Sequence, residues 1–271
     1  MKYAVGFLFF IILFACTRTE EKRTPLSFEY KTFRVESKGG CKSDTLQCAY
    51  FEVAYPEFTG LDTPVVKTIR QKIDVAVSMG NPESQGHNMK NIGEIFIQDY
   101  DDFKSEIPDA FGGWHYNAKV TVEVLTDTLL SLSVNDEYYT GGAHGGSGVY
   151  FINVNPKTGA EFTLDNLLKP DYSETLTQIG DKIFRQSKQL SDTASLIDNY
   201  FEFPEDKFEL NKNYGFKKDG IVFYYNSYEI APYAAGPTEV LIPYNELKEW
   251  LKKWYCNPFL LDVKLLLNNL P

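Results

Sequence analysis

The order of strand-like and helix-like segments is the feature that most constrains the fold of this chain of 271 residues. Apolar and polar residues alternate, as in half-buried strands, along 27–35, 47–55, 114–125, 129–139, 148–154, 220–225 and 238–242. Apolar residues recur at helical spacing along 65–77, 91–106, 173–190 and 243–254. Strands therefore come in groups, without a regular strand–helix–strand alternation. This order predicts an α+β fold of two intimate subdomains, with antiparallel sheets and helices packed on one side.

Composition limits the classes of partner. With 43% hydrophobic and 15% aromatic residues, the chain can bury a substantial core. Its formal net charge of −10 gives no electrostatic footprint for nucleic acid, so we expect no nucleic-acid partner. The acidity suits a cationic partner, although a plain solvated surface would produce the same value.

The first residues have the pattern of an export signal. Met1-Lys2-Tyr3 precedes an uncharged apolar run, 4–15, that is too short to span a bilayer but has the length of a signal-peptide core. The run ends in Leu13-Phe14-Ala15-Cys16, which resembles the lipobox of bacterial lipoproteins. The resemblance implies cleavage after residue 15, acylation of Cys16 and a membrane anchor, with 16–26 as a tether. The alternative is an ordinary signal peptide with a chance cysteine.

Export implies an oxidising compartment, where cysteines form disulfides. Cys41 and Cys48 lie close enough in the sequence to close a small loop between two predicted strands. Cys256 is then left over as a buried thiol, and pairing of Cys41 or Cys48 with Cys256 is the alternative.

A glycine-rich segment, 138–146, is the most unusual local sequence. Its glycines allow close backbone approach to a ligand, and His144 has the chemistry of a base or a metal ligand. A tight bend between two strands explains the same residues. The three histidines and four cysteines show none of the spacings of a zinc site, and no nucleophile motif is present, so we expect no cofactor, no metal and no catalytic residue.

A tyrosine-rich segment, 223–237, contains more tyrosines than a buried strand needs. Tyrosine rings provide contact area at low entropic cost, which suits recognition of sugars or proteins. The alternative is a strand followed by an irregular loop that closes at Gly236-Pro237.

These two segments resemble a known family. The runs Tyr139–Gly145, Asn155–Gly159 and Leu164–Leu168, with Tyr228–Gly236 and Ile242–Leu247, are similar to the extracytoplasmic domain shared by the anti-sigma factor RsiV and the peptidoglycan deacetylase PdaC. The resemblance implies subdomains at 27–155 (PdaC-like) and 156–255 (RsiV-like), followed by a tail, 256–271. RsiV uses this region to bind lysozyme. We expect neither the deacetylase activity nor the anti-sigma role here, because the chain has no room for those further segments.

The sequence therefore predicts a non-enzymatic binding or sensor domain, anchored by lipid in the bacterial envelope. We expect it at the outer membrane, facing the periplasm or the surface, and its ligand to be peptidoglycan glycan or a lysozyme-like protein. Two alternatives are a cell-wall glycan hydrolase that uses His144 with a carboxylate, and a structural envelope lipoprotein. The expected ligand-binding residues are Tyr139, Gly141, Gly142, His144, Tyr228, Glu229 and Tyr233.

Overall fold

The computed structural model describes residues 25–41, 47–78, 86–110 and 112–252. The elements in chain order are β1 (Ser27–Glu36), β2 (Ala49–Thr59), α1 (Thr63–Ala76), α2 (Met89–Glu106), β3 (Trp114–Leu125), β4 (Leu130–Tyr139), β5 (Gly146–Val154), α3 (Leu164–Leu167), α4 (Ser173–Ser187), β6 (Tyr214–Phe216), β7 (Gly220–Tyr225) and β8 (Thr238–Pro243). The expected signal peptide, the lipid site at Cys16, the leftover Cys256 and the tail all lie outside the described residues.

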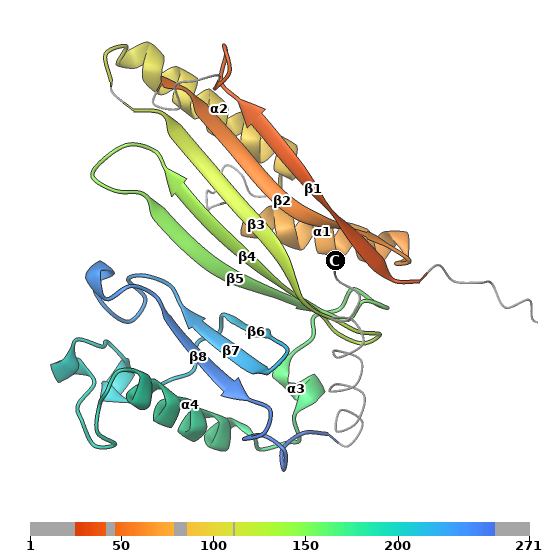
Figure 1. Ribbon diagram of the computed structural model, residues 1–271, viewed down its shortest axis with the longest axis vertical. Helices are drawn as coiled ribbons and strands as arrows, with labels where there is room; N and C mark the ends of the chain where they lie inside the picture. The colour runs from red at the N-terminus through yellow and green to blue at the C-terminus, as the bar shows by residue number, and fades with distance from the viewer. Residues whose placement is uncertain (1–24, 42–46, 79–85, 111, 253–271) are drawn as a thin grey trace, which may run out of the picture.

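The strands form two sheets, which confirms the α+β class. One sheet has the order β1-β2-β3-β4-β5 and the other the order β6-β7-β8, and β5 borders the second sheet (Figure 1). All pairings are antiparallel except that of β2 with β3, which is parallel. The exception arises because α1 and α2 lie between these two strands and return the chain to the end where β2 began.

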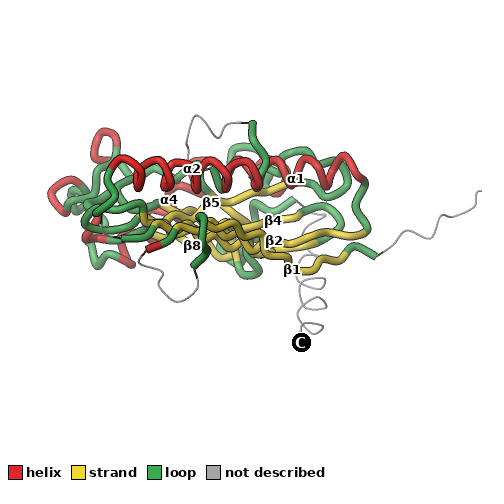
Figure 2. The backbone as a smooth tube through the Cα atoms, turned by 90° about the horizontal axis from the view of Figure 1, so that it is seen from above, coloured by secondary structure: helices red, strands yellow, loops and turns green. Residues whose placement is uncertain are grey.

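Helices α1 and α2 cover one face of the larger sheet (Figure 2). Each turns one apolar face toward the sheet, with Ile69 and Ile73 buried from α1 and Phe96 from α2. Phe51 of β2 is fully buried and stacks on Tyr116 of β3, with ring centroids 4.7 Å apart. None of the helices in the described ranges has both the length and the apolar character needed to cross a bilayer.

The second core lies between the smaller sheet and α4, which packs on β8. Three elements here differ from expectation, the first being α3, a single short helix that the sequence did not predict. The segment predicted as a last helix forms turns through residue 250, and Leu251 then makes an isolated bridge with Leu168, which needs extended backbone. Strand β6 was not predicted, because its three residues are too few for an alternating pattern to appear.

Candidate functional site

The glycine-rich and tyrosine-rich segments meet at one pocket of about 410 Å³. The end of β4, the loop before β5 and the first half of β5 form one wall, and the loop after β7 forms the other. The lining residues are Tyr138, Thr140, His144, Gly145, Gly146, Ser147, Tyr150, Asn226, Ser227, Tyr228, Glu229 and Tyr233. The pocket therefore combines four tyrosines and a histidine with a few hydroxyl, amide and carboxyl groups.

Three stacked rings from both segments join the two walls. The rings of His144 and Tyr233 lie 4.6 Å apart between centroids and 17° from parallel. The ring of Tyr228 also stacks on Tyr233, with centroids 5.4 Å apart and 29° between the ring planes. Tyr228 is 65% exposed and Tyr233 is 44% exposed, so the stack presents aromatic surface to solvent.

Two further tyrosines lie on glycines of β5. A Cβ atom on Gly146 would lie 2.5 Å from Cζ and Oη of Tyr138, and one on Gly148 would lie 2.8 Å from Oη of Tyr150. Only glycine leaves room for these rings to lie flat against the strand. Both tyrosines are on the face of the sheet that carries the core, at the end where that face becomes exposed.

Two asparagine side chains hold the second sheet against the free edge of β5. The amide of Asn226 pairs with Val149 as a strand would, because Val149 N donates to Oδ1 (2.7 Å) and Nδ2 donates to Val149 O (3.1 Å). Asn213 donates to the same carbonyl (2.7 Å) and accepts from Phe151 N (3.2 Å). These bonds pair backbone N–H and C=O groups of β5 that would otherwise face outward at the edge of the sheet, and they fix the loop that carries Tyr228.

Glu229 supplies the carboxylate of the pocket. Its two oxygens accept one hydrogen bond each, from Nδ2 of Asn211 and Nδ2 of Asn226. Among the described residues that line the pocket there is no lysine or arginine. The preceding residue, Tyr228, has φ +72°, a backbone conformation that is costly for a residue with a side chain. Such strain is typical of positions where function fixes the geometry.

A second carboxyl group lies beneath the tyrosines. Asp136 on β4 is buried, and the hydroxyl of Tyr116 donates to its Oδ2 (3.2 Å). Burial raises the pKa of Asp136 to about 6, although the hydrogen bonds from Tyr116 and the Gly148 amide oppose the shift. Burial also raises the pKa of Tyr150, and the negative charges of Asp136 and Glu229 raise it further.

The residues expected from the sequence divide into two groups. His144, Tyr228, Glu229 and Tyr233 line the pocket together. Tyr139, Gly141 and Gly142 do not line it.

These three shape the bend instead. The Tyr139 hydroxyl donates to Gly142 O (2.9 Å), and both glycines have positive φ. Sequence reasoning missed Tyr138, Tyr150 and Asn226. The alternation along β4 places Tyr138 on the core face of the sheet, and this pattern could have predicted that its ring faces the pocket.

His144 lines the open pocket, as the hydrolase alternative requires. However, Nδ1 of His144 donates to the carbonyl oxygen of Gly145 (2.8 Å). The imidazole is therefore held by a backbone group and not by the carboxylate that the hydrolase alternative requires. Within the ranges that the structure describes, no three His, Cys, Asp or Glu side chains are arranged to hold a metal ion.

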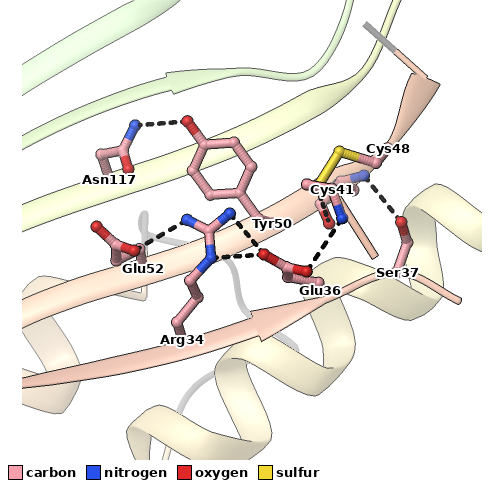
Figure 3. Close-up of a disulfide and its surroundings, with 9 residues drawn as sticks. Arg34, Glu36, Ser37, Cys41, Cys48, Tyr50, Glu52 and Asn117 are labelled. Atoms are coloured by element: carbon pink, nitrogen blue, oxygen red, sulfur yellow. Dashed lines mark hydrogen bonds and ion pairs between the residues drawn. A yellow bond between two sulfur atoms is a disulfide. The ribbon is translucent and has the colours of Figure 1, made fainter. Parts of the chain in front are cut away.

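The predicted disulfide is present at the same end of the strands as the pocket, but at the opposite edge of the larger sheet. Cys41 and Cys48 are bonded, which closes the connection between β1 and β2 (Figure 3). Beside it, Arg34 pairs with Glu36 (2.7 Å) and Glu52 (2.9 Å). The Cys41 amide and the Arg34 guanidinium lower the pKa of Glu36. This network stabilises the hairpin of β1 and β2.

Comparisons with known proteins match the two halves of the chain separately. The family model described as deacetylase PdaC matches residues 41–147, and the model described as a protein of unknown function, DUF3298, matches residues 165–245. The first includes His144, and the second includes Tyr228, Glu229 and Tyr233.

Two solved structures share the fold. A DUF3298 family member from Bacteroides fragilis is 24% identical, with a TM-score of 0.58 over 86% of this chain and 96% of its own. A DUF3298 family protein from Pseudomonas aeruginosa is 19% identical, with a TM-score of 0.59 over 85% of this chain and 96% of its own.

One curated relative matches more locally. Penicillin-binding protein 2B of Streptococcus pneumoniae is 29% identical over 102 residues, which cover 33% of this chain. The chain spans only 15% of the length of that protein.

Proposed function

We propose that this chain, which belongs to the extracytoplasmic domain family that joins a PdaC-type region to a DUF3298 region, is an envelope binding protein whose tyrosine pocket recognises peptidoglycan glycan. The observation that carries the proposal is the stack of His144, Tyr233 and Tyr228 at the edge of an open pocket. An exposed stack of this kind is a platform for the flat, apolar face of a sugar ring.

The polar groups of the pocket support the same ligand. Binding pockets typically combine apolar and aromatic walls with a few polar groups that fix orientation. Here Thr140, Ser147 and Glu229 offer two hydroxyls and a carboxylate beside the rings. These groups can donate to and accept from the hydroxyls of a sugar. We therefore propose binding without catalysis, and glycan hydrolysis by His144 is the outcome that would replace it.

A lysozyme-like protein is the second candidate ligand. The observation in its favour is the formal net charge of −10, because an acidic surface attracts a cationic partner over a distance set by the ionic strength. Strong salt dependence of binding to lysozyme, with no binding to glycan, would favour this candidate.

The test is calorimetric titration with soluble muropeptides and, separately, with lysozyme. Tyr228→Ala and Tyr233→Ala should each weaken glycan binding about 5- to 10-fold, as expected for loss of roughly 1 kcal/mol of ring contact. Tyr200→Ala is the matched control, because Tyr200 is 78% exposed and does not line the pocket. The absence of heat with both ligands, or equal losses in all three variants, would reject the proposed site. Release of reducing ends from the glycan would show hydrolysis instead.

We further propose that Cys16 carries the lipid anchor, which would hold the pocket close to the cell wall. Tethering raises the effective concentration of a weak binder near its ligand. Metabolic labelling with palmitate should mark the wild-type protein and not Cys16→Ser. Equal labelling of both would reject Cys16 as the acylated residue.

A further inference from the structure

The pocket contains the carboxylate of Glu229, and none of the described residues that line it is a lysine or an arginine. Resting on the proposed function, we infer that the pocket selects amino sugars with a free ammonium group over their N-acetylated counterparts. Glu229 would receive the ammonium, and the tyrosine rings would surround it.

The hydrogen bonds of Glu229 leave its charge uncompensated. Both donors to its carboxylate, Asn211 and Asn226, are neutral amides, and each oxygen retains an acceptor position. Glu229 forms no ion pair with any other described residue. A neutral ligand that covered this carboxylate would strip water from it without replacing the lost interaction, which is unfavourable. An ammonium group would replace that water with a charge-assisted hydrogen bond.

The surroundings of the pocket add to the negative potential. Asp136 lies behind Tyr150 and carries a second negative charge when it is ionised. Glu229 also lines an adjacent depression of about 380 Å³. The other charged residues that line this depression are Glu202, Glu209 and Lys212, so negative groups are in excess there. Further negative groups therefore lie near Glu229, one of them buried and two of them in the adjacent depression.

The aromatic rings favour the same charge. The faces of tyrosine rings attract cations, with a gain of roughly 0.5–2 kcal/mol depending on solvent exposure. Tyr138, Tyr150, Tyr228 and Tyr233 all line the pocket. Because Glu229 directly follows Tyr228, a sugar stacked on the ring platform would have its substituents within reach of the carboxylate. This juxtaposition of a flat platform with a carboxylate points to an amino sugar more than to a flexible lysine side chain.

The experiment compares two oligosaccharides that differ only in acetylation. Calorimetry would measure binding of the glucosamine tetramer and the N-acetylglucosamine tetramer, at a pH where the free amine is protonated. We expect the wild-type protein to bind the glucosamine tetramer about 10-fold more tightly. Glu229→Gln, which keeps the size and one acceptor oxygen, should remove this preference, so that the ratio of the two affinities falls from about 10 to about 1.

A control variant separates the local effect from general charge. Glu246→Gln also removes one negative charge, but Glu246 is exposed and does not line the pocket, so it should keep the preference. Equal losses in Glu229→Gln and Glu246→Gln would overturn the inference. A lysine-containing stem peptide that bound more tightly than the amino sugar would also overturn it.

The outcomes distinguish this inference from the proposed function. Equal binding of both tetramers by the wild-type protein would reject the ammonium preference and leave glycan binding in place. Binding of neither tetramer, nor of muropeptides, would reject both. Thermal unfolding and circular dichroism of each variant would verify that the fold is intact.

Discussion

Replacement of Asp136 by asparagine should flatten the dependence of the unfolding free energy on pH. Asp136 is only 8% exposed, and burial raises its pKa from 3.8 to about 6. Between these two pH values the folded protein binds more protons than the unfolded chain. The protonated carboxyl therefore favours the folded state most at low pH, and this contribution is lost as the pH rises through about 6.

The magnitude follows from the size of the shift. An increase in pKa from 3.8 to about 6 corresponds to roughly 3 kcal/mol, because each tenfold change in an equilibrium constant is ~1.4 kcal/mol. This contribution should appear in the wild-type protein and be absent in Asp136→Asn. The asparagine keeps an oxygen that can accept from the Tyr116 hydroxyl, so the variant changes the ionisation more than the packing.

Urea unfolding, followed by tryptophan fluorescence at several pH values from 4 to 7, would measure the difference. The free energy of unfolding of Asp136→Asn minus that of the wild type should rise by about 2.5 kcal/mol across this range, because the unfolded carboxyl is already partly ionised at pH 4. Asp192→Asn, at an exposed position, is the control and should follow the wild type. Parallel curves for Asp136→Asn and the wild type would refute the reasoning, since the buried carboxyl would then not be protonated in the folded state.

Three further changes test the contacts that shape the fold, each by urea unfolding. The double variant Cys41→Ser/Cys48→Ser should lose about 2–3 kcal/mol of stability, and an unchanged value would mean that the short loop adds no constraint. Gly220→Ala should destabilise by roughly 1–3 kcal/mol, because its Cβ would lie 2.2 Å from the carbonyl oxygen of Ile242; a wild-type midpoint would contradict this close approach. Asn213→Ala should cost about 1–3 kcal/mol by leaving edge groups of β5 without their partner, and no loss would show that water replaces the amide.

Much of the fold could be predicted from the sequence, because its strands and helices are long enough to show their periods. The alternation over 114–125 and 129–139 predicts β3 and β4, and the helical spacing over 91–106 predicts most of α2. The parallel pairing of β2 and β3 could not be predicted in this way. Periodicity describes each strand separately and contains no information on which strands pair or in which direction.

The site could be predicted in part, for a related reason. His144 and the tyrosines at 228 and 233 stand out in unusual segments, and these segments do meet. Tyr150 belongs to an ordinary strand, and Tyr138 is the first residue of the glycine-rich segment. The place of both in the pocket depends on the register that puts glycines beneath their rings. Asn226 was missed because its role is to bond the edge of a strand distant in the sequence.

The pocket depends on the position of the second sheet against the edge of the first. Each family model matches one wall, and the walls meet where Asn226 pairs with the edge of β5. Without that pairing, the loop carrying Tyr228 and Tyr233 would have no fixed distance to His144, and the ring stack would be lost. Either half alone would retain aromatic side chains but not their arrangement. The chemistry of this site is therefore a property of the junction between the two regions.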